Sequence, residues 1–323
     1  MRFINVIQVK QLGFSLVELM VSMVISLFLT LGIFTMFNMS STNVTTTSQF
    51  SQLQENGRIA LALMERDLSQ LGFMGDITGT GLTTGNTSIS ATPVANDCVG
   101  AGINNASFPN NQPAHFRVLW GFEQGVGAGN FPCFTAKTNT DVIQLKRLIG
   151  PSTLATTVSR YYAAVTSDQL TFFDGSAAVP AIANSRVWEY QHHIYFINND
   201  GTIPVLRRKN LSIGNGMNNE EQLVEGIENM RILYGFDNDG DDTADSYMPV
   251  QNVTDLMWDN QLFQRLVSLK VFLLVRSIQE DKNYTNDVTY KLGDKTLSGF
   301  NDHYRRKVVS TTIVLENPVL IRN

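Results

Sequence analysis

The aspartate-rich stretch DNDGDDTAD at residues 237–245 is the part of the sequence whose side chains point most clearly to chemistry. Alternating carboxylates suit Ca²⁺, because this ion takes about six to eight oxygen ligands from a flexible loop. The candidate ligands hold positions 1, 3, 5, 7 and 9 of a calcium-loop pattern and are Asp237, Asp239, Asp241, the carbonyl of Thr243, and Asp245. Without a cation, the five aspartates of this stretch would repel one another.

The same stretch departs from an EF-hand in two respects. Gly240 falls at position 4 instead of position 6, and Met248 stands at position 12, where an EF-hand has a bidentate glutamate. The pattern is closer to the DxDxDxxxD repeats of some extracellular proteins. We therefore predict a structural Ca²⁺ site, and the alternative is an exposed turn that binds no metal.

Other constellations that support catalysis or metal binding are missing from the sequence. The two cysteines do not form a CxxC pair, the four histidines show no HxxxH or CxxH spacing, and there is no GxSxG, HExxH or Walker motif. We expect a chain that is not an enzyme and requires no cofactor. The net charge of −5, without a basic cluster, also argues against direct contact with nucleic acid.

A 24-residue apolar run at residues 14–37 has Glu18 as its one ionisable side chain. As a helix it would reach about 36 Å, enough for a bilayer core of about 30 Å. Arg2 and Lys10 precede the run, and no charge follows it until Glu55. The positive-inside rule then predicts a single-pass protein whose N-terminus stays in the cytoplasm and whose remaining chain lies on the outer side of the membrane.

Two simpler interpretations fit this segment less well. A secretory signal peptide has a shorter apolar core and a small-residue cleavage site. A plain signal anchor leaves Glu18 unexplained, since a carboxylate in a membrane span is costly and is usually retained for a partner.

The segment GFSLVELMVSMVI, which begins at Gly13, resembles the processing signal of type IV prepilins and type II secretion pseudopilins. The resemblance implies that residues 1–13 are a leader peptide, which a prepilin peptidase removes after Gly13. It also implies that Phe14 becomes the N-methylated first residue. Glu18 would then neutralise the α-amine of a neighbouring subunit during assembly, which is consistent with the rule that buried charges are paired.

The apolar span, residues 14–38, is followed by an amphipathic pattern over residues 39–75. Its apolar stripe recurs at steps of three and four and consists of Phe50, Leu53, Gly57, Ala60, Met64, Leu68 and Leu71. We expect one long helix that is interrupted or softened near the threonine-rich stretch 38–54 and ends near Gly72 or Gly75. A separate helix after a linker is the alternative.

Beyond the helix, residues 76–140 are rich in Gly, Asn, Thr and Pro and read as a loop-bearing region. It contains Cys98 and Cys133. Outside the inner membrane these should form a disulfide, and closing a loop of this length is worth about 4 kcal/mol in the chain-entropy model. Free buried thiols are the alternative.

Residues 141–323 read as an antiparallel β domain. The predicted strands are 141–148, 168–173, 186–197, 203–208, 230–236, 266–276 and 305–317, with a hairpin turn at 199–201. Within one strand, His192 and His193 should be one core-facing and one exposed residue. The expected fold is α+β and type IV pilin-like, with a long N-terminal helix packed on an antiparallel sheet.

Four blocks spread over most of the chain resemble the PilW family of minor pilins, and they are residues 54–73, 223–242, 266–277 and 305–317. The length also suits a minor pilin better than a major pilin, whose chains are typically shorter. One departure is Asp76, where many relatives have a cysteine, so the predicted disulfide depends on Cys98 and Cys133 alone.

The resemblance implies a subunit that helps to initiate pilus assembly and lies near the pilus tip, with a role in twitching motility, adhesion or DNA uptake. Its partners would be other minor pilins, the major pilin, the prepilin peptidase and the inner-membrane assembly machinery. Two alternatives stay open. One is a J-type minor pseudopilin of type II secretion, and the other is an adhesin or binding module displayed on the pilus.

Overall fold

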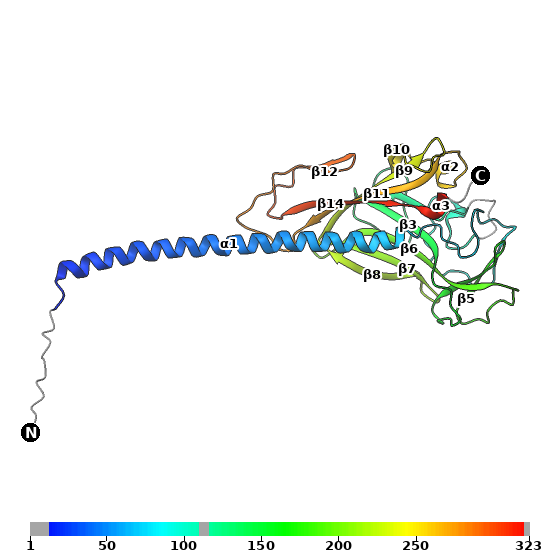
Figure 1. Ribbon diagram of the computed structural model, residues 1–323, viewed down its shortest axis with the longest axis horizontal. Helices are drawn as coiled ribbons and strands as arrows, with labels where there is room; N and C mark the ends of the chain where they lie inside the picture. Colours follow the sequence, from blue (N-terminus) through cyan, green and yellow to red (C-terminus); the bar gives the residue numbers. More distant parts are fainter. Residues whose placement is uncertain (1–12, 110–115, 320–323) are drawn as a thin grey trace, which may run out of the picture. The chain divides into compact units, whose positions relative to one another are not determined.

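The computed structural model describes residues 13–109 and 116–319 (Figure 1). The predicted leader lies outside the described residues except for Gly13. The chain divides into two compact units, residues 1–51 and 52–323, and each is described by itself.

A single helix, α1 (Leu16–Leu68), accounts for the described part of the first unit and continues into the second. The helix runs through the threonine-rich stretch without the predicted interruption. Its hydroxyl groups bond within the helix: Thr42 Oγ1 donates to the Asn38 carbonyl and Thr45 Oγ1 to the Ser41 carbonyl, each at 3.0 Å. These bonds satisfy side chains that would otherwise compete with helix formation.

The helix ends at Leu68, earlier than the predicted limit of residue 75. Successive turns follow, in which Leu71 N donates to Leu68 O and Phe73 N to Gln70 O. Gly72 and Gly75 both adopt left-handed backbone conformations, with φ of 73°. The glycines therefore shape the turn after the helix and do not mark its last residue.

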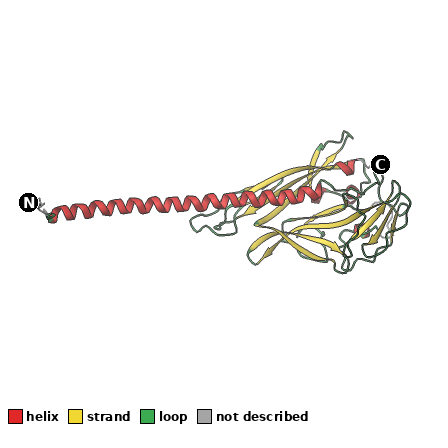
Figure 2. Cartoon of the chain, turned by 60° about the horizontal axis from the view of Figure 1, so that its bottom comes forward, coloured by secondary structure: helices red, strands yellow, loops and turns green. Residues whose placement is uncertain are grey.

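The second unit contains a large mixed sheet of eight strands and a separate antiparallel sheet of four strands (Figure 2). The large sheet has the order β1-β5-β4-β6-β3-β2, and β7 pairs with β6 and β8 with β7. Its strands are β1 (Thr87–Ile89), β2 (Leu119–Glu123), β3 (Asp141–Ile149), β4 (Tyr161–Val165), β5 (Leu170–Asp174), β6 (Arg186–Asp200), β7 (Ile203–Ser212) and β8 (Gly216–Glu225).

The smaller sheet has the order β10-β9-β11-β14, and a two-stranded hairpin lies apart from it in the pairing. The strands are β9 (Ile227–Asp237), β10 (Ser246–Pro249), β11 (Arg265–Arg276), β12 (Tyr290–Leu292), β13 (Lys295–Leu297) and β14 (Arg306–Val314). Short helices complete the unit: η1 (Ile103–Asn105), η2 (Val250–Asn252), α2 (Asp255–Trp258) and α3 (Glu316–Val319).

The main core joins the end of α1 to both sheets. Leu53, Ala60, Met64 and Leu68 of α1 are almost completely buried, and they belong to one cluster with residues of β3, β6, β7, β9 and β11. Burial at these positions confirms the predicted apolar stripe from Leu53 onward, because residues three and four apart share one face of a helix. Its first predicted member, Phe50, is 44% exposed, so the buried stripe begins one turn later than predicted. The expected α+β fold is therefore confirmed.

The structure confirms the predicted hairpin and contains several strands that were not predicted. The hairpin at residues 199–201 is confirmed, since β6 and β7 pair up to Asp200 and Ile203 around Gly201, whose φ is 59°. Strands β1 and β2 lie inside the region expected to be loops. Strands β4, β8, β10, β12 and β13 were not predicted either.

Candidate assembly site

The predicted processing and assembly residues lie at the start of α1. Glu18 Oε2 accepts a hydrogen bond from the Ser15 backbone N–H at 2.9 Å, and Ser15 Oγ accepts one from the Glu18 N–H at 3.2 Å. This reciprocal pair is a capping box, which satisfies backbone donors that have no partner within the helix. The chain thus uses Glu18 to begin its own helix, in addition to the predicted role between subunits.

A long apolar surface follows Glu18. Every large hydrophobic side chain of α1 from Leu16 to Val44 is exposed, and Phe14 just before the helix is 88% exposed. The helix is long and apolar enough to cross a membrane, by length and composition. An exposed apolar surface of this size is favourable in contact with lipid or with other helices and unfavourable in contact with water. This part of α1 is therefore suited to a membrane or to a helix bundle.

The C-terminal end of α1 is fixed to the large sheet by a buried acid that the sequence interpretation missed. Asp67 lies 2.6 Å from Arg147 of β3 and 2.6 Å from Nδ1 of His193 of β6, and it accepts a hydrogen bond from Tyr195 at 2.5 Å. Arg208 of β7 approaches it at 3.4 Å. A signal was available, since Asp67 interrupts the apolar stripe between Met64 and Leu68.

The electrostatics of this cluster keep Asp67 ionised. Burial alone would raise the pKa of Asp67, but the hydrogen bonds from His193 and Tyr195 and the charge of Arg147 outweigh burial and hold that pKa well below its usual value. Burial lowers the pKa of His193, and Asp67 opposes this only in part. His193 is therefore a neutral hydrogen-bonding partner near neutral pH.

The prediction that one of the two adjacent histidines is exposed is wrong. His192 and His193 have 0% and 7% of their surface exposed. They point to opposite faces of β6, as neighbours on a strand must, but both faces are covered. Residues of α1 cover the His193 side, and the segment that carries Asp97 and Ser107 covers the His192 side.

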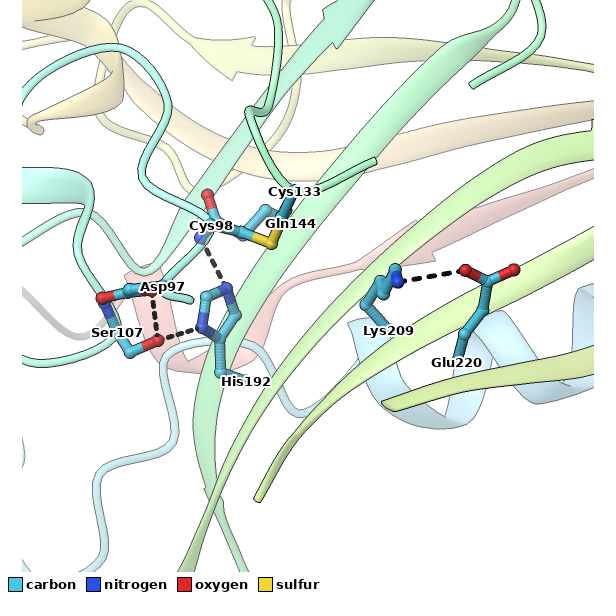
Figure 3. Close-up of a disulfide and its surroundings, with 8 residues drawn as sticks. All are labelled: Asp97, Cys98, Ser107, Cys133, Gln144, His192, Lys209 and Glu220. Carbon is cyan, nitrogen blue, oxygen red and sulfur yellow. Dashed lines mark hydrogen bonds and ion pairs between the residues drawn. A yellow bond between two sulfur atoms is a disulfide. The ribbon is translucent and has the colours of Figure 1, made fainter. Parts of the chain in front are cut away.

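The predicted disulfide between Cys98 and Cys133 is present, with the two Cα atoms 5.5 Å apart. Figure 3 shows a hydrogen-bonded chain beside it. Ser107 Oγ lies 2.7 Å from both Asp97 Oδ1 and His192 Nδ1, and His192 Nε2 lies 2.5 Å from Gln144 Nε2. Burial lowers the pKa of His192, so the neutral ring links the disulfide-bearing loop to the sheet.

A second buried ion network joins the two sheets and was also missed. Arg231 of β9 contacts Glu123 of β2 at 2.7 Å and Asp141 of β3 at 3.1 Å. It also contacts Asp294 of the β12–β13 hairpin at 2.7 Å, and Lys295 of that hairpin pairs with Glu123. One buried guanidinium thus connects three separate strand groups, as suits its forked geometry.

The acidic loop joins β9 to β10 and gathers some of the predicted ligands. Carboxylate oxygens of Asp237, Asp239 and Asp245 lie within 4.8 Å of one another. The carboxylate of Asp241 instead accepts hydrogen bonds from the Thr243 N–H at 2.8 Å and the Thr243 hydroxyl at 2.5 Å. Three of the predicted ligands therefore share one space, while Asp241 is tied to Thr243.

The charges of the loop match a site for a hard cation. Backbone N–H donors, first that of Gly240, lower the pKa of Asp237. The hydrogen bond from the Asp241 N–H is the largest influence on Asp239 and lowers its pKa, but repulsion from Asp241, Asp245 and Asp237 together reverses this and leaves the pKa of Asp239 raised. An all-oxygen donor set of this kind fits Ca²⁺.

Two family models match the chain. Residues 194–317 match the type IV pilus-assembly protein W model, and residues 9–34 match the prokaryotic N-terminal methylation motif. No curated protein and no solved structure matches. The second match contains Gly13, Phe14 and Glu18, and the first runs from the middle of β6 through β14. Together with the α+β fold, these matches support a type IV pilin of the PilW family.

Proposed function

We propose that this chain is a minor pilin that helps to initiate type IV pilus assembly at the inner membrane. A role in pilus assembly follows from the family. The observation that carries the finer assignment is that the PilW match falls on the β domain, including all of the smaller sheet, and not on the N-terminal helix, whose methylation signal is common to prepilins and pseudopilins.

In this role the chain acts through contacts and not through catalysis. The prepilin peptidase would cleave after Gly13, and Phe14 would carry the N-methyl group. The exposed apolar part of α1 would hold the subunit in the membrane and then pack against neighbouring helices, with the β domain in the periplasm. Its partners would be other minor pilins, the major pilin and the inner-membrane assembly machinery, and its place in the filament would be near the tip.

We further propose that the acidic loop holds a structural Ca²⁺ ion. Asp237, Asp239 and Asp245 would supply carboxylate ligands, because their oxygens already lie close together. Asp241 and the carbonyl of Thr243, the remaining predicted ligands, would join them. The ion would neutralise the repulsion within the loop and stiffen the connection between β9 and β10.

Deletion of the gene in its own host tests the proposed function. Surface pili, sheared from cells and quantified by immunoblot of the major pilin, should fall strongly, and a plasmid-borne copy should restore them. Normal pili with lost attachment would favour a displayed adhesin. Normal pili with impaired release of secreted enzymes would favour a J-type pseudopilin, and either result would reject the proposal.

A further inference from the structure

A polar cavity of about 510 Å³ lies where the C-terminal end of α1 meets the large sheet. Its walls come from the end of α1, from β3, β6, β7 and β8, and from the segment between β3 and β4, all within the second unit. Ligand pockets of proteins commonly have volumes of about 300–1,000 Å³. The cavity is therefore large enough for a small ligand, and its lining indicates which kind.

The charged side chains that line the cavity include one arginine more than the acids can pair with. Arg66, in the last turn of α1, is exposed and contacts no acid within the described residues. The other three arginines of the lining each pair with one of its three acids, and the pairs are Asp67–Arg147 at 2.6 Å, Glu221–Arg208 at 2.8 Å and Glu189–Arg160 at 2.7 Å. The cavity thus carries one uncompensated positive charge, on an accessible guanidinium.

The uncharged polar part of the lining consists of amides and hydroxyls, and its members are Gln70, Ser159, Gln191, Asn210, Ser212 and Asn219. Three polar atoms of the lining residues are buried without a hydrogen-bond partner among the described residues, and they are Oδ1 of Asn210 and Nε of Arg147 and of Arg208. Buried polar atoms are costly unless a ligand or an ordered water meets them. Because a hydroxyl group both donates and accepts, a ligand with several hydroxyls suits a lining that offers unpaired donors and an unpaired acceptor.

We propose that this cavity binds an acidic sugar, namely a uronate residue of a polysaccharide. The Arg66 guanidinium would pair with the sugar carboxylate, since these two planar groups can form two parallel hydrogen bonds. The sugar hydroxyls would bond to the amides and hydroxyls of the walls. One carboxylate matches the single positive charge that the lining leaves uncompensated, whereas a phosphate monoester carries a charge of about −1.5 to −2. This binding is additional to the assembly role and does not depend on it.

Titration of the full-length, detergent-solubilised chain with matched sugars tests the proposal. Glucuronate and galacturonate should each bind about tenfold more tightly than glucose and galactose, which lack only the carboxylate, because a charge-assisted hydrogen bond is stronger than a neutral one. Acetate, a carboxylate without hydroxyls, should bind as weakly as the neutral sugars. Saturation-transfer NMR detects the binding, and competition between the ligands gives their relative affinities.

Two variants of α1 separate binding from a purely structural role of Arg66. A positive charge in the last turn also stabilises a helix through its macrodipole, and that role requires no ligand. Arg66→Gln should remove the preference for the uronates, because glutamine is polar but uncharged. Arg58→Gln is the matched control, since Arg58 lies on the same helix, pairs with Glu55 and does not line the cavity. The melting temperature of each variant shows whether the fold is retained.

The relative affinities decide the result. A preference for the uronates that is lost with Arg66→Gln and kept with Arg58→Gln supports the acidic-sugar site. Absence of binding by both uronates, equal binding of a uronate and its neutral counterpart, binding of acetate as tight as that of the uronates, or an unchanged preference in Arg66→Gln would overturn it. Pilus counts in the deletion strain decide the proposed function separately, because the sugar titrations use the isolated chain.

Discussion

Glu18 caps the start of α1, and this cap is compatible with the role between subunits that we predict for the same carboxylate. Its carboxylate accepts the Ser15 N–H, which stabilises the first turn of the helix. A carboxylate has further acceptor sites on its two oxygens, so it can also bind a cationic group of another subunit. The first function needs an acceptor at this position, whereas the second needs a negative charge.

Replacement of Glu18 by Ala and by Gln separates these functions. We expect both variants to be cleaved after Gly13 and inserted in the membrane, yet neither should enter pili, because pairing with a cationic amine requires the charge. The measurement is an immunoblot of membrane and sheared-pilus fractions, with mass spectrometry of the mature N-terminus.

The Gln variant distinguishes the two functions, because its amide oxygen can still accept the Ser15 N–H while its side chain has no charge. Ser15→Ala is the matched control, because it removes the hydroxyl that accepts the Glu18 N–H and leaves the carboxylate in place. Incorporation of Glu18→Gln at the wild-type level would show that Glu18 acts through the helix cap alone.

At the scale of elements, the sequence predicted what local periodicity determines. The α1 stripe from Leu53 to Leu68 and the long strands β6, β9 and β11 have the apolar periodicity of segments that face a core, and all of them contribute to the main core. Strand β14 was predicted from its β-branched sequence, although most of its residues are not buried. The short strands were not predictable in this way. Strand β1 consists of three residues and exists because it pairs in parallel with β5, which lies some eighty positions later.

In the candidate site, too, local features could be predicted and contacts between distant residues could not. Cys98–Cys133 and the acidic loop are visible as local residue types, whereas the partners of Asp67 and Arg231 come from distant strands and depend on tertiary structure. The exposure predicted for one histidine failed for a related reason. Alternation predicts opposite faces, but it does not show whether a second layer covers each face.

The acidic loop between β9 and β10 supplies a prediction at this scale. We expect millimolar Ca²⁺ to raise the melting temperature of the detergent-solubilised chain, because an ion that binds the folded loop stabilises it by mass action. Asp239→Asn should abolish the shift. Asp241→Asn should reduce it less, because the carboxylate of Asp241 is bonded to Thr243.

Calorimetric titration gives a second measurement of the same event. Mg²⁺ at equal concentration is the control, since it prefers a smaller, octahedral site that keeps several waters. Absence of heat and of any melting shift with Ca²⁺ would reject the metal site and leave the loop as an exposed turn.

At the scale of the whole molecule, two buried polar networks connect secondary-structure elements in specific positions. Apolar packing alone would not fix these positions, because it is not directional. One fixes the end of α1 to β3, β6 and β7 through Asp67, and the other joins both sheets and the β12–β13 hairpin through Arg231. Removal of one partner from such a network is costly because it leaves a buried charge unpaired. The networks therefore make the stability of the domain depend on pH.

The two buried histidines should destabilise the domain in mild acid. Burial lowers the pKa of His192 well below its usual value, with Lys146 and His193 adding repulsion, and burial also lowers that of His193. The unfolded chain then takes up protons first, near pH 6.5, so stability falls as the pH drops below that value. Each histidine contributes up to about 1.4 kcal/mol per pH unit.

Two buried aspartates also make the stability depend on pH, and their contributions change in different directions and pH ranges. The effect of the histidines must therefore be isolated by comparing variants. Burial raises the pKa of Asp141 to about 7, despite the charge of Arg231, and its contribution to stability is lost as the pH rises from about 4 toward 7. The pKa of Asp67 is lowered, so its contribution is lost only below about pH 4. The raw pH profile is therefore a sum of opposing contributions.

We predict that His192→Gln removes one histidine contribution while retaining a side chain that can hydrogen-bond to Ser107 or Gln144. As the pH falls from 7 to 5, the free energy of unfolding should fall less in this variant than in the unmodified chain, because only the unmodified chain loses the His192 contribution. This expectation does not depend on how the two free energies differ at pH 7. Denaturant unfolding of the solubilised chain measures this difference. His303→Gln, at an exposed histidine, should keep the unmodified slope. Parallel pH profiles for His192→Gln and the unmodified chain would show that His192 is not the acid-sensitive group of this fold.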